Sequence, residues 1–279
     1  MAIENIPEIY IKDSTKNSDL FVYDFKMSND VVKSKVNLGM NMFSFLQVGK
    51  KQVHFSGNTV AVNKDQSLLL KKGNWLWTEL LDTETIYYCK LFFFSEQKLT
   101  DFLSKYTNNV KPYKEEVPYF VIENDDYIAA FISSLSSKAF EKNNYSSALL
   151  SLKFDEIMLY LLDKYGNPFE YYLHALISKE ISPFNSTIES HINSNLKVEE
   201  IAFLCNMSLS TFKRHFIAAY NSPPGQWFQD KRLQKAKVLL QEGHLKPSDI
   251  YLDIGYNNLS NFSTAFKNKF GINPTEISN

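Results

Sequence analysis

Cysteine is scarce in this chain, and long apolar runs and an N-terminal leader pattern are lacking altogether. Its 279 residues include two cysteines, Cys89 and Cys205, which lie far apart in apolar stretches. We therefore expect neither a disulfide nor a cysteine-based metal site. No run of about 18 apolar residues occurs, so no transmembrane helix is expected. The start, MAIENIPEIY, has no basic segment followed by an apolar one. These absences predict a cytoplasmic protein with no membrane partner.

Catalytic and cofactor motifs are lacking as well. The chain has no Ser-His-Asp arrangement and no Walker loop, and its nine glycines form no glycine-rich nucleotide loop. His54 is the only histidine in the N-terminal third, whereas a metal centre needs several histidines and carboxylates that converge. We expect no enzyme, no metal and no cofactor.

An overall excess of basic residues is also lacking, but the charges are unevenly distributed. The net charge is −1. From Cys205 onward there are nine basic and five acidic residues, whereas the remainder has 21 basic and 26 acidic residues. An acidic N-terminal part followed by a basic C-terminal part is typical of a sensor or dimerisation domain attached to a DNA-binding domain.

The stretch from Leu196 to about Pro274 contains one pattern twice. The copies are 49 residues apart up to Met207 and Tyr256, and 50 apart from Ser208 and Asn258 onward. An internal repeat of this length marks a repeated structural unit. Each copy predicts a short helix, a turn and a second amphipathic helix.

The first copy predicts a helix-turn-helix. Apolar residues at i, i+3, i+4 and i+7 from Val198 to Cys205 indicate one buried helix face. Asn206 suits the turn because asparagine tolerates positive φ, and Ser208 is a good N-cap. The second helix is expected to be of a size to enter the DNA major groove. Its predicted inward residues are Leu209, Phe212, Phe216 and Tyr220.

The second copy repeats this logic after a linker helix. Pro247 opens its first helix, Gly255 makes the turn and Asn258 caps the second helix. The linker, from Pro223 to about Gln241, would be a strut of roughly 25 Å. It could hold the two second helices in successive major grooves, about 34 Å apart. The predicted inward residues of the last helix are Leu259, Phe262, Phe266 and Phe270.

This C-terminal pattern resembles the AraC family of bacterial transcription regulators, whose DNA-binding domain has two helix-turn-helices joined by a helix. The residues that carry the resemblance are Phe212 to Phe216, Arg232, Ala236, Leu239, Leu240, Asp249, Ile250, and the closing run Gly255, Tyr256, Phe262, Phe266, Lys267, Phe270, Gly271 and Pro274. Asn206 and Asn221 stand where the family usually has glycine, and Tyr251 stands where it has a small residue.

The predicted DNA contacts lie on the outer faces and N-termini of the two second helices. Arg214 and Lys213 are the strongest candidates, because arginine can bond guanine in a bidentate manner; an ordinary solvated helix face is the alternative. Lys267 and Lys269 are expected beside phosphates. The second helix of the second copy has no basic residue at its main base-facing positions. The predicted DNA-binding residues are Ser208, Ser210, Lys213, Arg214, Asn258, Ser260, Asn261, Ser263, Thr264 and Lys267.

Residues 1 to about 112 look mainly β. Short apolar or alternating runs occur at 42–48, 53–55, 60–62, 67–70, 75–77 and 87–94. Their spacing predicts a small sandwich or barrel, and the resemblance implies a cupin-like barrel. Its aromatic cluster could line a ligand pocket or simply form core. The cluster comprises Trp75, Trp77, Tyr87, Tyr88, Phe92, Phe93 and Phe94.

Helical patterns follow at 97–106, 124–142, 145–165 and 171–179. The segment 145–165 is apolar over more than half its circumference, which favours a buried helix or an interface helix. The resemblance implies that this region pairs two protomers; covering the barrel is the alternative. The likeliest break follows at 180–183, which predicts domains at residues 1–179 and 180–279.

The sequence thus predicts an α+β protein, with a cupin-like sensor and dimerisation domain followed by an all-α DNA-binding domain. The resemblance implies a homodimeric activator that binds double-stranded DNA and contacts RNA polymerase. Control would pass through the N-terminal domain, by a small molecule or by a partner protein. The order of elements also looks like the branch of the family that controls type III secretion. The alternative is a regulatory interaction protein with a degenerate DNA-binding domain. Tyr251 and the lack of basic residues at the main base-facing positions of the last helix would fit it.

Overall fold

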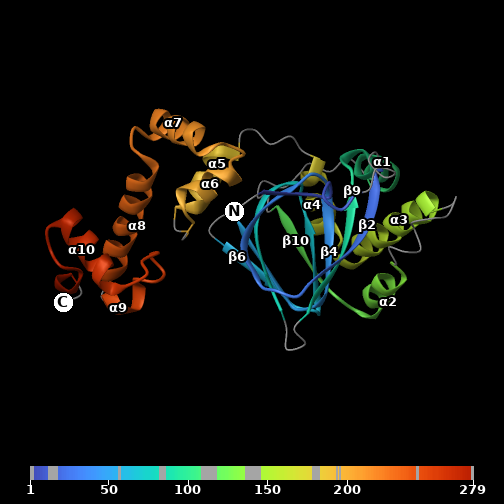
Figure 1. Ribbon diagram of the computed structural model, residues 1–279, viewed down its shortest axis with the longest axis horizontal. Coiled ribbons are helices and arrows are strands. Elements are labelled where there is room, and N and C mark those ends of the chain that lie inside the picture. Colours follow the sequence, from blue (N-terminus) through green and yellow to red (C-terminus); the bar gives the residue numbers. More distant parts are fainter. Residues whose placement is uncertain are drawn as a thin grey trace. The chain divides into compact units, whose positions relative to one another are not determined.

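The computed structural model describes residues 3–11, 18–55, 58–81, 86–107, 118–135, 146–177, 183–192, 194, 196–242 and 245–277. The chain divides into two compact units, one holding nearly all of residues 1–180 and the other residues 181–279 (Figure 1). Of the boundary predicted at 180–183, residues 180–182 lie outside the described residues.

The first unit contains two five-stranded sheets, whose strands curve around a common interior in Figure 1. One sheet has the order β1 (Ile3–Ile6), β3 (Val31–Leu38), β8 (Gly73–Leu80), β5 (Lys50–Phe55), β6 (Asn58–Val62). The other has the order β10 (Tyr119–Glu123), β7 (Gln66–Leu70), β4 (Asn41–Val48), β9 (Tyr87–Phe94), β2 (Leu20–Met27). The α+β class is confirmed, and the described strands form two sheets rather than one continuous closed sheet.

The central strands of the second sheet are buried on both faces. Every residue of β4 from Asn41 to Leu46 is buried, and β9 is buried at six of its eight positions. Phe43 and Phe92 point into a large apolar cluster that helices complete, while alternate residues of the same strands face the other way. Burial on both faces explains why these strands are near-continuous apolar runs instead of alternating ones.

Four helices cover this face of the sheet: α1 (Glu96–Tyr106), α2 (Asp126–Ser134), α3 (Ser146–Tyr165) and α4 (Asn167–Ile177). On α3, Phe154, Ile157 and Leu161 are fully buried. Leu152 is 65% exposed, however, and Leu149 and Leu159 are also exposed. One face of this helix therefore covers the sheet, and an apolar stripe faces outward. The pairing of two protomers through this region stays a prediction.

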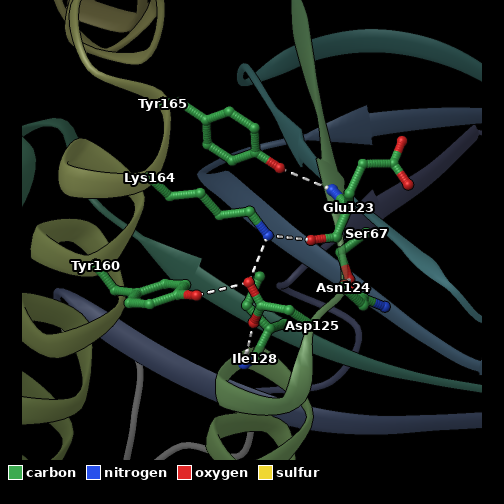
Figure 2. Close-up of polar contacts among 8 residues, drawn as sticks. All are labelled: Ser67, Glu123, Asn124, Asp125, Ile128, Tyr160, Lys164 and Tyr165. Atoms are coloured by element: carbon green, nitrogen blue, oxygen red, sulfur yellow. Dashed lines mark hydrogen bonds and ion pairs between the residues drawn. The ribbon is translucent and has the colours of Figure 1, made fainter.

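Polar contacts fasten the end of α3 to the segment between β10 and α2 (Figure 2). Lys164 Nζ lies 2.6 Å from Asp125 Oδ2 and donates to the Glu123 carbonyl, and the Tyr160 hydroxyl donates to Asp125 at 2.6 Å. Asp125 also caps α2 by accepting from the Ile128 amide at 3.0 Å. Partial burial raises the pKa of the Asp125 carboxyl, but these hydrogen bonds and the lysine outweigh it and hold the pKa at about 2.

Several elements of the first unit differ from the sequence prediction. No individual strands were predicted at β1, β2 or β3, although that region was expected to be β, and β10 lies beyond the predicted β region. The helix predicted at 124–142 is described as α2 only to Ser134, and residues 136–145 lie outside the described residues. β10 directly follows Pro118, and pairing with β7 determines its extended state.

The second unit is helical: α5 (Pro183–His191), α6 (Val198–Leu204), α7 (Leu209–Tyr220), α8 (Pro224–Gln241), α9 (Pro247–Ile250), α10 (Leu259–Phe270) and a 3-10 turn at Pro274–Glu276. It has two apolar clusters, one centred on Phe212 and Phe216 and the other on Phe262 and Phe266. The linker helix α8 contributes Phe228 to the first cluster and Leu233, Ala236 and Leu240 to the second. It therefore joins two small cores.

Candidate nucleic-acid interface

The turns of the two copies have the same backbone hydrogen bonds. In the first, the Met207 amide donates to the Ala202 carbonyl at 3.0 Å; in the second, Tyr256 donates to Tyr251 at 2.9 Å. Asn206 and Gly255 occupy equivalent positions with φ of 57° and 84°. The prediction that asparagine replaces glycine in a left-handed turn is confirmed at Asn206 and again at Asn221, with φ 51°.

Tyr251 stands at the position that Ala202 occupies in the first helix-turn-helix, where Ala202 is 1% exposed. Its side chain is half-buried and packs against the second cluster, so the unit accommodates the bulky residue at its edge. α9 extends only over Pro247–Ile250 and continues as turns to Gly255. The turn and its hydrogen bonds are nevertheless preserved.

α7 and α10 begin with the predicted caps. The Ser208 hydroxyl accepts from the Thr211 amide at 3.2 Å, and Asn258 Oδ1 accepts from the Asn261 amide at 2.8 Å. Both helices are 12 residues long and end at a left-handed residue, Asn221 or Gly271. The capping side chains are thus already engaged with their own helices.

Nine of the ten predicted DNA-binding residues are exposed, and Ser263 is half-buried. Ser210, Lys213 and Arg214 lie on the outer side of α7, opposite Phe212 and Phe216, which are fully buried. The equivalent residues of α10 are Ser260, Ser263 and Thr264, and Asn261, at the position of Thr211, is exposed beside them. The structure therefore presents two equivalent polar surfaces, one basic and one neutral.

The prediction that Leu209 and Leu259 face the core is wrong. Both are 39% exposed, at the first position of their helices. The core of each unit is completed by phenylalanines one and two turns further along, so the first turn of each helix extends past it. Their equal exposure in the two copies places a leucine beside each polar surface. A helical periodicity alone cannot distinguish this from burial.

Lys269 does not lie free beside Lys267. Its ammonium pairs with Asp230 of α8, which fastens the end of α10 to the linker helix. This pair reduces the case for Lys269 as a phosphate neighbour.

Two titratable side chains are buried in and beside the first helix-turn-helix, in the C-terminal unit. His191 is 2% exposed, and burial lowers its pKa to about 4. Cys205 is 3% exposed, and burial raises its pKa to about 11, although a hydrogen bond from Thr187 acts in the other direction. Cys205 is therefore an unreactive thiol, and both cysteines are free.

The interior of the N-terminal unit, which holds the two sheets, contains a buried ion pair beside the aromatic cluster. Lys51 Nζ lies 3.0 Å from Glu79 Oε1 and 3.9 Å from the centroid of the Trp77 ring, and neither side chain of the pair is more than 7% exposed. The Tyr87 hydroxyl donates to the same Glu79 oxygen at 2.9 Å. Trp75, Tyr87 and Phe92 to Phe94 are buried as core, while Tyr88 is half-buried. Among the described residues, no three His, Cys, Asp or Glu side chains could hold a metal ion.

Two family models match the chain. Residues 41–169 match the ExsA N-terminal regulatory domain, and residues 193–279 match a helix-turn-helix domain. Thermoregulatory protein LcrF of Yersinia pestis is 26% identical over 137 residues, which are 49% of this chain and 51% of that protein. HTH-type transcriptional regulator ExsA of Pseudomonas aeruginosa is 26% identical over 128 residues, 46% of each chain.

The chain belongs to the AraC family of transcription regulators. It spans about half the length of the curated relatives that it matches. Apo ToxT K231A from Vibrio cholerae is similar with a TM-score of 0.46 and 15% identity, over 93% of this chain and 97% of that one. Of the helices described in this AraC-family chain, none is long and apolar enough to cross a membrane.

Proposed function

We propose that this protein is a sequence-specific regulator that binds promoter DNA through α7 and α10 and acts chiefly as an activator. The observation that carries the proposal is the duplicated helix-turn-helix with Lys213 and Arg214 exposed on the outer side of α7. The ten residues predicted from the sequence form the proposed interface. A regulator of bacterial promoters acts in the cytoplasm, which we propose as the location of this protein.

The preserved turn of the second helix-turn-helix supports this function over that of an interaction protein with a degenerate DNA-binding domain. The turn of the second unit keeps the hydrogen bonds of the first despite Tyr251. Its α10 is capped by Asn258 and presents Ser260, Asn261 and Thr264 at exposed positions, where they can reach a base edge. We propose that the boundary near residue 180 separates a regulatory domain from a DNA-binding domain, and that neither domain is catalytic.

The first unit is proposed to pair two copies of the chain and to receive the controlling signal. Leu149, Leu152 and Leu159 of α3 are exposed at separations of three and seven residues, the spacing of a helix-pairing seam. The match to a regulatory domain supports control through this unit, by a small molecule or a partner protein. Contact with RNA polymerase is proposed from the family alone.

The deciding experiment measures binding to the DNA upstream of the gene for this protein, at several salt concentrations. Wild type should bind that segment well above random DNA, with a salt slope of several units. Lys213→Ala/Arg214→Ala should lose at least about tenfold in affinity, since one bidentate arginine pair is worth about 1–3 kcal/mol.

The matched control is Lys50→Ala/Lys64→Ala, which removes the same charge from exposed positions of the first unit. It should bind like wild type. Equal binding by wild type and the α7 variant would contradict the proposed interface. Failure of wild type to prefer any genomic segment would favour the interaction-protein alternative.

A further inference from the structure

α7 and α10 have the same backbone but different outer side chains. Both helices have 12 residues, a side-chain cap at the preceding residue and a left-handed residue at the end. Arg214 and Thr264 are each the sixth residue of their helix. A difference in what the two helices recognise must therefore come from side chains.

The outer side of α7 is suited to guanine. Arg214 is exposed, and arginine is the side chain that most often bonds guanine O6 and N7 in a bidentate manner. Lys213 beside it adds a second cation, and lysine also donates to these two acceptors.

The outer side of α10 has no charged side chain in its first eight residues, 259–266. Asn261 is exposed, and its backbone amide, not its side chain, makes the capping hydrogen bond with Asn258. An asparagine amide matches adenine N6 and N7, and a threonine methyl or another apolar group packs against the thymine methyl. Thr264 and the exposed Leu259 supply such groups.

The basic residues at the end of α10 do not alter this preference. Lys267 lies one turn beyond Ser263, and Lys269 is paired with Asp230. A cation at Lys267 can add affinity for phosphates, which carry no sequence information of their own.

We infer that the two helices recognise half-sites of opposite composition: α7 a guanine-containing half-site, and α10 an A·T half-site read by Asn261, Thr264 and Leu259. The inference rests on the proposed function and specifies its DNA target. The two half-sites lie about one helical turn, roughly 34 Å, apart on one face of the duplex.

The test is in vitro selection by the full chain from random duplexes of about three helical turns. Wild type should enrich a guanine in one half and A·T pairs in the other. Thr264→Arg places at the sixth position of α10 the residue type that α7 has there, at an exposed site. It should change the second half-site to favour G·C over A·T by about tenfold and leave the first unchanged.

Two variants complete the design. Arg214→Thr should lose the guanine preference and keep the A·T half, and Lys267→Ala should weaken binding to all sequences alike. Circular dichroism checks that each variant is folded. Enrichment of G·C pairs in the α10 half, or of no base there, would overturn the inference. The proposed function would still stand if wild type selected a sequence in the α7 half. No enrichment in either half would overturn both.

Discussion

Lys51 is a fully buried lysine whose charge is stabilised by Glu79 on the neighbouring strand. Burying two charges is tolerated only because they are paired and have further partners. The ammonium of Lys51 also lies over the Trp77 ring, and the carboxylate of Glu79 accepts a hydrogen bond from the Tyr87 hydroxyl. Removing one partner leaves the other buried without compensation, which costs more than the pair itself contributes.

Glu79→Gln should therefore destabilise the protein by about 3 kcal/mol or more. The matched control is Glu96→Gln, which breaks the Lys72–Glu96 pair, where both side chains are 44% exposed. That change should cost less than about 1 kcal/mol. Urea unfolding followed by tryptophan fluorescence measures both, and equal losses would show that the interior pair is not desolvated.

His191 should make the stability of the DNA-binding unit depend on pH. Burial lowers its pKa from 6.5 to about 4, so the unfolded chain binds the proton more readily than the folded one. The contribution is complete above pH 6.5 and is lost as the pH falls toward 4, by about 3 kcal/mol at most. Thermal unfolding between pH 7 and pH 4 measures this. In His191→Gln the slope over this window should flatten, and an unchanged slope would assign it to other groups.

At the scale of the element, the two helix-turn-helix units depend on one left-handed residue at each turn. Asn206 adopts φ 57° without being glycine, because its short polar side chain tolerates this region. The turn aligns the second helix with the first, and its geometry is repeated at Gly255.

Asn206→Ala should cost about 1 kcal/mol, because alanine has no local hydrogen bond to offset the left-handed conformation. Asn206→Gly should leave the stability unchanged or raise it slightly. Chemical unfolding of the two variants distinguishes the backbone requirement from any side-chain role. If both substitutions destabilise equally, the asparagine side chain itself is needed.

At the scale of the whole molecule, one surface feature of the first unit bears on the proposed homodimer. Leu149, Leu152 and Leu159 form an exposed apolar stripe on α3, while the opposite face of the helix is packed in the core. The polar contacts of Asp125 and Lys164 hold this helix at a defined position on the sheet (Figure 2).

Leu152→Glu should shift the chain from dimer to monomer, because it introduces a charge into the middle of the stripe. Light scattering after size-exclusion chromatography measures the mass in solution. Val32→Glu, at a residue that is 54% exposed on β3, is the control and should not change it. A Leu152→Glu variant of unchanged mass would move the proposed interface elsewhere.

The sequence by itself determined the C-terminal architecture. The 49- and 50-residue offsets, the caps Ser208 and Asn258, and the asparagine or glycine at each left-handed position are local signals, and local hydrogen bonds realise them. The predicted linker helix likewise ends at Gln241 as its apolar pattern indicates. Duplication strengthened every such signal, because each was present twice.

Only the tertiary structure decided which apolar residues are buried and how the strands are arranged. Leu209, Leu259 and Leu152 have the periodicity of core residues, yet they are exposed because no element among the described residues covers them. β2, β3 and β10 are strands because partners distant in the chain pair with them. The ion pair of Lys51 and Glu79 is likewise invisible in the sequence, since 28 residues separate the two and only sheet register brings them together. Local hydrogen bonding is encoded within a few residues, whereas burial and strand pairing depend on what the rest of the chain places nearby.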